Sequence, residues 1–134
     1  MSLPDTNKII LAYLNTKAGV TALVSDRIYC PSAPENALLP NITFFTRGGT
    51  STPYIPDLTS PSKQFDCWAT DPIVARQVYR ALYDALQGLE RTAVTIGATT
   101  NYILSAIEEV QGQDLVDEIP GRYRVLTFFE IIIR

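Results

Sequence analysis

The side chains that could carry out chemistry in this sequence are few, and histidine is not among them. The 134 residues include two cysteines, 14 acidic residues and no histidine. Catalysis by Ser-His-Asp or Cys-His sets in their usual forms is therefore excluded, and the commonest metal ligand is missing. The sequence predicts no catalytic residue, no metal site and no cofactor, and it favours a protein that is not an enzyme.

The carboxylates do not form a convincing acid/base pair. Glu108 and Glu109 are adjacent in a predicted strand, so their side chains must point to opposite faces and cannot cooperate. Asp114, Asp117 and Glu118 cluster in one polar segment and could bind a hard cation. A solvated acidic loop is the favoured interpretation, because such residues are mostly exposed.

The two cysteines indicate core packing rather than reactivity. Cys30 and Cys67 lie far apart without metal-type spacing, which favours two buried reduced thiols in a cytosolic protein and leaves a disulfide as the alternative. Cys67 is flanked by Phe65 and Trp68 in a predicted strand, a position typical of a core. Trp68 itself could be a face-packing aromatic or an interface anchor, and the pattern does not decide between them.

Composition places limits on the class of protein. With 46% hydrophobic and 19% charged residues, the chain is expected to fold as a single domain over 1–134. A net charge of −3 and the lack of any Lys/Arg cluster argue against tight binding of nucleic acid through its phosphates. The chain carries neither a signal-peptide pattern nor an apolar run of about 18 residues, so a soluble protein without a membrane partner is expected.

One strand-to-helix unit organises the predicted fold. Residues 63–70 alternate between apolar and polar positions, as a strand does. Asp71 can cap the next helix and Pro72 suits its first position, while Gly88 can end it. The apolar stripe of this helix consists of Val74, Val78, Leu82, Ala85 and Leu86. Such an amphipathic helix is expected to pack on the sheet that holds the strand.

The remaining elements predict an α+β fold. Asp5 can cap a short helix with Ile9, Ile10, Tyr13 and Leu14 on its apolar side, and residues 20–24 add a further turn or two. Strands are predicted at 41–47, 90–96, 101–110 and 122–134, with a polar connection at 111–121. The more apolar face of the last strand carries Tyr123, Val125, Thr127, Phe129, Ile131 and Ile133. We expect a mostly antiparallel sheet with two main helices packed on one face, and a core shared by the helix stripe and the last strand.

A long loop is predicted at 48–62. This stretch contains two glycines, three prolines and six Ser/Thr residues, so no strand pattern is visible in it. Loops above about 12 to 15 residues in compact domains are usually functional or disordered. Tyr54, Ile55 and Leu58 are its apolar anchors, and they are the candidate assembly contacts. We expect the loop to become ordered only against a partner.

The order of these elements resembles a family of virus proteins. The segments that carry the likeness are LVSDRIY at 23–29, the strand-to-helix unit at 64–86, and the Tyr123-Arg124-Val125 entry into the last strand. Together they resemble the small tail-completion and tail-terminator proteins of long-tailed bacteriophages and prophages. The resemblance spans nearly the whole chain, and it includes no catalytic motif.

The resemblance implies a structural role in the virion. Such proteins act at the head-to-tail joint, so it implies a ring of copies, commonly six, with head-connector and tail-tube proteins as partners. DNA would pass through the ring without specific binding, and the protein would be found in the virion neck or, during assembly, in the host cytoplasm. The alternative from a different class is a small-molecule or peptide binding module of the same α+β type, without catalysis.

Overall fold

The computed structural model describes residues 3–51, 54–55 and 58–134. A six-stranded sheet in the order β1-β2-β3-β6-β5-β4 forms the framework. The elements in chain order are α1 (Thr6–Asn15), α2 (Ala18–Val24), β1 (Ile28–Tyr29), β2 (Asn41–Ser51), β3 (Thr59–Ala69), α3 (Pro72–Leu86), β4 (Leu89–Ile96), β5 (Thr99–Val116) and β6 (Tyr123–Ile133).

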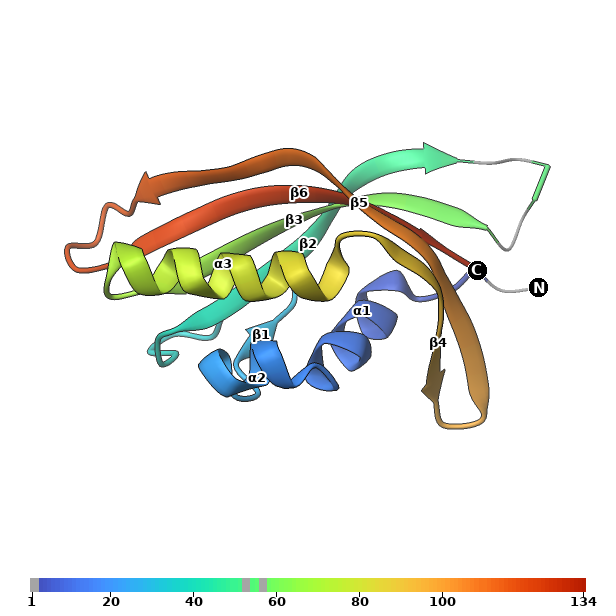
Figure 1. Cartoon of the computed structure of the whole chain (residues 1–134), viewed down its shortest axis with the longest axis horizontal. Coiled ribbons are helices and arrows are strands. Elements are labelled where there is room, and N and C mark those ends of the chain that lie inside the picture. Colours follow the sequence, from blue (N-terminus) through green and yellow to red (C-terminus); the bar gives the residue numbers. More distant parts are fainter. Residues whose placement is uncertain (1–2, 52–53, 56–57) are drawn as a thin grey trace.

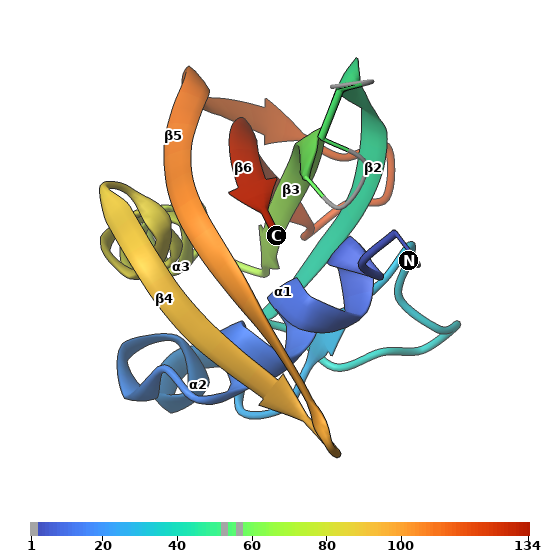
Figure 2. The same cartoon turned by 90° about the vertical axis from the view of Figure 1, so that its right-hand side faces the viewer.

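The sheet is mixed and strongly curved. Four of its pairings are antiparallel, and the short β1 runs parallel to β2. Figure 1 shows the three helices together below the central strands. In Figure 2 the sheet curves round α1, with β4 on one side and β2 on the other. The architecture combines a sheet with helices as the α+β class requires, but it has a third helix, α2, of seven residues.

Helix α3 matches its sequence prediction at both ends. The Asp71 carboxylate accepts a hydrogen bond of 2.8 Å from the backbone N–H of Ile73, and Pro72 occupies the first turn. Gly88 follows the helix with a φ of +80°, a conformation that favours glycine. These signals are local, which is why the sequence alone located this helix.

The core lies between α3 and the inner face of the sheet, as predicted. Val78, Leu82 and Leu86 of the helix stripe are buried, and α3 contacts β3, β5 and β6. On β6 every odd position from Val125 to Ile133 is buried. The aromatic rings of Phe44, Phe65 and Phe129 link β2, β3 and β6, with centroid distances of 5.4 and 5.8 Å.

Leu82→Ala should destabilise the fold by about 2 to 5 kcal/mol, because truncating a fully buried leucine removes apolar contacts and leaves a cavity. The exposed Asp84, two residues further along α3, provides the control, and Asp84→Ala should change the free energy of unfolding by about 0.5 kcal/mol or less. Denaturant unfolding of both variants measures the difference. Equal effects would mean that the stripe does not form the core.

The predicted loop at 48–62 is wrong in its boundaries. Strand β2 continues to Ser51 and β3 begins at Thr59, and they pair through Gly49↔Pro61, Thr50↔Ser60 and Ser51↔Thr59. The pairing follows a register shift between Thr46 and Gly49. Backbone hydrogen bonds from the neighbouring strand hold this stretch, so it needs no apolar alternation of its own. We call residues 47–51 and 58–61, together with Tyr54 and Ile55 at their end, the β2–β3 arm.

Gly49 is required for the bend of this arm. Its φ is +130°, and a Cβ there would lie 2.4 Å from the Ser60 carbonyl oxygen and 2.7 Å from the Pro61 Cα. Both clashes are with backbone, which cannot rotate away. Only glycine permits the two strands to approach so closely at this bulge.

The polar connection predicted at 111–121 is also too long. Strand β5 runs to Val116, and Gln113, Asp114, Leu115 and Val116 pair with residues of β6. Register shifts interrupt the ladder between Ile103 and Gln113, so β5 bends as it crosses the sheet. A bulged strand with one open face does not show clean alternation, which explains why its second half resembled a loop.

A buried lysine joins three elements on the inner side of the sheet. Lys63 of β3 is fully buried, and its Nζ donates to Thr6 Oγ1 at 2.7 Å, to Asn7 Oδ1 at 2.5 Å and to Thr46 Oγ1. Thr6 and Asn7 are the first residues of α1, and Thr46 is the β2 partner of Lys63. The amine therefore fixes the start of α1 to the base of the β2–β3 arm.

Burial lowers the pKa of Lys63 from its ordinary 10.5 to about 8 in the folded protein. Between these values the unfolded chain keeps the proton that the folded chain releases, so the free energy of unfolding should rise with pH. Lys63→Met should lack this contribution. Unfolding of both proteins between about pH 7.5 and 9.5 tests it.

The comparison of the two proteins removes the effect of the groups that do not interact with Lys63. Burial raises the pKa of Cys67 and of Tyr79, which lowers stability as the pH rises, and both groups are common to the two proteins. Burial also raises the pKa of Cys30, and Lys63 acts against this rise, so removing the amine raises the pKa of Cys30 further and lowers the stability of the variant at high pH. The stability difference between wild type and Lys63→Met should therefore shift in favour of wild type as the pH increases. A difference independent of pH would contradict the lowered pKa.

Candidate assembly surfaces

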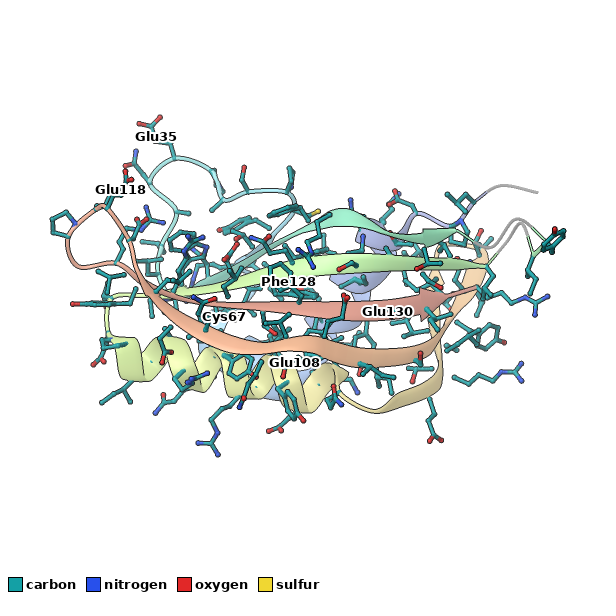
Figure 3. The ribbon with its side chains drawn as sticks, turned by 90° about the horizontal axis from the view of Figure 1, so that it is seen from above. Glu35, Cys67, Glu108, Glu118, Phe128 and Glu130 are labelled. Carbon is teal, nitrogen blue, oxygen red and sulfur yellow. The ribbon has the colours of Figure 1, made fainter. Side chains whose placement is uncertain are left out.

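The outer face of the sheet carries apolar side chains without a helix layer over them. Figure 3 looks onto this face, with Phe128 and Glu130 on β6 and the helices behind or beside the strands. Phe45, Leu126 and Phe128 are half-buried there, and Val110 of β5 is exposed. An antiparallel sheet with one solvated face usually has polar residues on it. This face is more apolar than that, which is typical of an interaction surface.

Arginine side chains lie over the aromatic rings of the outer face. The Arg47 guanidinium lies 3.8 Å from the centre of the Phe128 ring, and Arg122 and Arg124 lie 4.8 and 5.3 Å from the centre of Trp68. Each is a cation–π contact. Trp68 is half-buried and its Nε1 donates to Thr43 Oγ1 at 3.0 Å. Trp68 thus belongs to the outer face and not to the core.

An acidic group is buried beside these arginines. Asp66 is 4% exposed and accepts from Arg124 Nη1 at 3.3 Å. Burial raises the pKa of the Asp66 carboxyl, and the Gln64 amide and Arg124 act against this rise. The carboxylate holds one of the guanidinium groups against Trp68, which makes the arginine layer part of the fold.

The three candidate contact residues lie between β2 and β3. Tyr54 is 93% exposed and Ile55 is 40% exposed, while Leu58 is half-buried and its N–H donates to the Ile55 carbonyl at 3.1 Å. They stand at the end of the β2–β3 arm, which extends beyond the helices in Figure 1. Tyr54 and Ile55 are thus presented to solvent, whereas Leu58 packs partly against its own chain.

An apolar groove lies at the opposite end of the molecule. It has a volume of about 270 Å³ and is formed by the first turn of α3 with the adjoining ends of β5 and β6. Ala75 and Val125 form its buried floor, and Val116 stands exposed at its edge. The groove could not be predicted from the sequence, because β5 was not expected to reach Val116.

A larger hollow separates α3 from the middle of β5. It has a volume of about 600 Å³ and is open to solvent, with Tyr83, Arg80 and Gln111 at its surface. At its base the Tyr79 hydroxyl donates to Glu108 Oε2 at 2.7 Å. Thr127 Oγ1 donates to the same oxygen at 2.7 Å. The carboxylate is thus engaged by structural hydrogen bonds rather than presented as a catalytic base.

Glycine allows β5 to approach Tyr79. A Cβ on Gly112 would lie 2.6 to 2.9 Å from three atoms of the Tyr79 ring. The Gly112 N–H donates to the Tyr79 hydroxyl at 3.2 Å, and Arg76 Nη1 donates to the Gly112 carbonyl at 3.2 Å. A glycine inside a strand pattern indicates such a close approach, so this signal was available in the sequence.

The other acidic candidates, Glu109, Asp114 and Asp117, form hydrogen bonds or ion pairs within the chain. Glu109 accepts from Ser62 Oγ at 2.6 Å on the outer face, opposite to Glu108, as strand alternation predicted. Asp114 lies 3.3 Å from Arg76, and Asp117 lies 3.8 Å from Arg122. Among the residues that the structure describes, no group of three or more potential ligands could hold a metal ion.

The thiols are not joined. Cys30 and Cys67 are both free, so the disulfide alternative is wrong. Cys67 is completely buried in the core, and this burial strongly raises the pKa of its thiol. The thiolate is therefore suppressed at neutral pH, and a nucleophilic role for Cys67 is disfavoured.

Comparison with known proteins identifies a shared fold. No protein-family model and no curated protein sequence matches the chain. A solved structure does match: a chain of the virion of native gene transfer agent (GTA) particle superimposes with a TM-score of 0.65 at 13% sequence identity. The alignment covers 94% of this chain and 92% of the other. The two chains share a fold.

The alignment leaves only a small fraction of either chain unmatched. At 13% identity the likeness rests on the arrangement of elements and not on particular side chains. In the described part of the chain, none of the helices has the length and apolar character needed to span a membrane.

Gly112→Ala should destabilise the protein by about 1 to 3 kcal/mol, because its methyl group overpacks the Tyr79 ring. The control is Gly19→Ala in α2, where a Cβ would meet nothing within 4 Å. That change should be neutral or stabilise by up to about 1 kcal/mol, since alanine favours a helix over glycine. Denaturant unfolding compares them. Equal effects would contradict the proximity of β5 and Tyr79.

Proposed function

We propose that this protein is a structural component of a phage-like virion and acts at the neck as a tail-terminator or tail-completion protein. In this role copies of the chain form a ring between the head connector and the tail tube. The observation that carries the proposal is the fold shared over 94% of the chain with a chain of a GTA virion particle. The resemblance of its elements to phage tail-completion proteins points to the same role.

The surfaces of the chain support an assembly role. An apolar outer face, an exposed aromatic at the tip of an arm and an apolar groove all offer contact area to other proteins. Aromatic residues and arginine, which occur on these surfaces, are enriched at protein–protein interfaces. The described candidate sites, by contrast, hold acidic groups that are occupied by internal hydrogen bonds or ion pairs. Assembly without catalysis is the function that these features favour.

The charge of the chain suits a ring through which DNA passes. The net charge is −3, and Arg122 and Arg124 of the outer face are paired with Asp117 and Asp66, so these arginines do not form a continuous basic track for phosphates. In this proposal the ring surrounds the DNA path without gripping the duplex. The protein is then located in the virion and, before assembly, in the host cytoplasm.

The hollow between α3 and β5 supports a second candidate function, that of a small-molecule or peptide binding module. Its volume of about 600 Å³ lies in the range of ligand pockets, which are usually concave and mostly apolar. This hollow is open, and the charged Arg80 and Asp84 line it. We therefore rank it second. A ligand-dependent rise in melting temperature would favour it.

Measurement of the particle mass in solution tests the first proposal. As the protein concentration increases, we expect a species with a defined multiple of the 14.8 kDa chain mass, and six copies if the ring follows the phage proteins that the sequence resembles. Negative-stain images of that species should show rings with a central opening. Closed symmetry is the usual result when one contact repeats around an axis.

A second measurement separates assembly from simple aggregation. The distribution of masses should end at the ring and should not continue to larger species. A chain that stays monomeric at every accessible concentration, with no rings in the images, would count against the ring. An open series of sizes would instead indicate a contact that does not close.

A further inference from the structure

The two ends of the molecule carry apolar features of opposite shape. At one end the β2–β3 arm projects Tyr54 and Ile55 into solvent; at the other lies the groove of about 270 Å³. Figure 1 places the arm and the first turn of α3 at opposite ends of the longest axis. A chain therefore cannot insert its own arm into its own groove, and any contact between them must join two copies.

The groove suits an apolar side chain that carries a hydroxyl group. Its lining is mostly apolar and includes Ala75, Leu115 and Val125, while Asp114 and Arg124 are the charged residues among those that form it. A buried tyrosine needs a hydrogen-bond partner for its hydroxyl. The Asp114 side chain is 68% exposed and its Oδ2 contacts Arg76, so the carboxylate can accept a further hydrogen bond.

The charges of the groove also favour an uncharged occupant. Asp114 is paired with Arg76, and Arg124 is paired with Asp66, each at 3.3 Å. A charged side chain in the groove would add an ion to a site whose ions are already paired, and burying such an ion is costly. The side chains of Tyr54 and Ile55 carry no charge. Tyrosine is moreover a frequent anchor residue in protein interfaces.

We propose that Tyr54 and Ile55 of one copy occupy the groove between α3, β5 and β6 of a second copy, with the Tyr54 hydroxyl donating to Asp114. The inference rests on the proposed self-assembly and names its contact. Because the arm and the groove are different surfaces, the contact is heterologous and can repeat from copy to copy around a ring. The anchor supplies one part of an interface, since a stable one buries about 1,200 to 2,000 Å².

Cysteine cross-linking tests the contact. In a Cys30→Ser background, the remaining native thiol is the buried Cys67. One protein carries Ile55→Cys, which keeps the Tyr54 anchor, and a second carries Val116→Cys at the edge of the groove. When the two are mixed at concentrations that support assembly and treated with diamide, they should give a disulfide-linked dimer that contains one chain of each. Placing both substitutions in one chain should give a ladder of covalent oligomers.

The matched control moves the second cysteine away from the groove. Ile107 is 56% exposed and lies on the same strand as Val116, about 30 Å away along an extended chain. Ile55→Cys mixed with Ile107→Cys should cross-link at least tenfold less than the pair with Val116→Cys. Tyr54→Ser combined with Ile55→Ser should leave the melting temperature nearly unchanged and raise the concentration needed for assembly at least tenfold.

The outcomes separate this contact from the proposed function. Equal cross-linking of the two pairs in protein that forms rings would overturn the arm-in-groove contact and leave the ring proposal standing. Chains that remain monomeric and do not cross-link would overturn both. Selective cross-linking at 55–116 together with a ladder from the doubly substituted chain would support the contact.

Discussion

Burial of the inner sheet face by α3 is the constraint on which the rest of the structure depends. The helix contacts β3, β5 and β6, and its leucines share a core with the odd positions of β6 and with the phenylalanines of β2 and β3. A shift of one residue in the pairing of β3 with β6 would move either Phe65 or Phe129 to the outer face. The register of the central strands, and with it the position of the arm and of the groove, follows from this packing.

The elements with local signals could be predicted from the sequence. Helix α3 has a cap, a first-turn proline, an apolar stripe and a terminal glycine, so its boundaries were correct. The inner face of β6 and the burial of Cys67 followed from alternation. Glu108 and Glu109 were also placed on opposite faces, because the geometry of a strand requires it. Each of these predictions used information within about ten residues of the position concerned.

The predictions that failed concern segments whose structure depends on distant neighbours. The arm residues Thr50 and Thr59 are ordered by pairing across the hairpin and not by their own pattern. The second half of β5 contains Gln111, Gly112 and Gln113, which resemble a loop until β6 and Tyr79 are present. Alternation places Lys63 on the same face as Phe65 and Cys67, but the acceptors of its amine are on α1 and β2, which are distant in the sequence. Its hydrogen-bond partners could therefore not be inferred from spacing, and neither could a groove formed by three elements.

The position of Lys63 has a mechanical consequence for the arm. Its amine is bound to Thr46 and to the first turn of α1, at the base of the β2–β3 hairpin. A force applied to the tip therefore does not act on the two strands alone, since the amine transmits it to α1 and from there to β4, which α1 contacts. Lys63 thus connects the base of the hairpin to α1 and, through α1, to β4 at the far edge of the sheet.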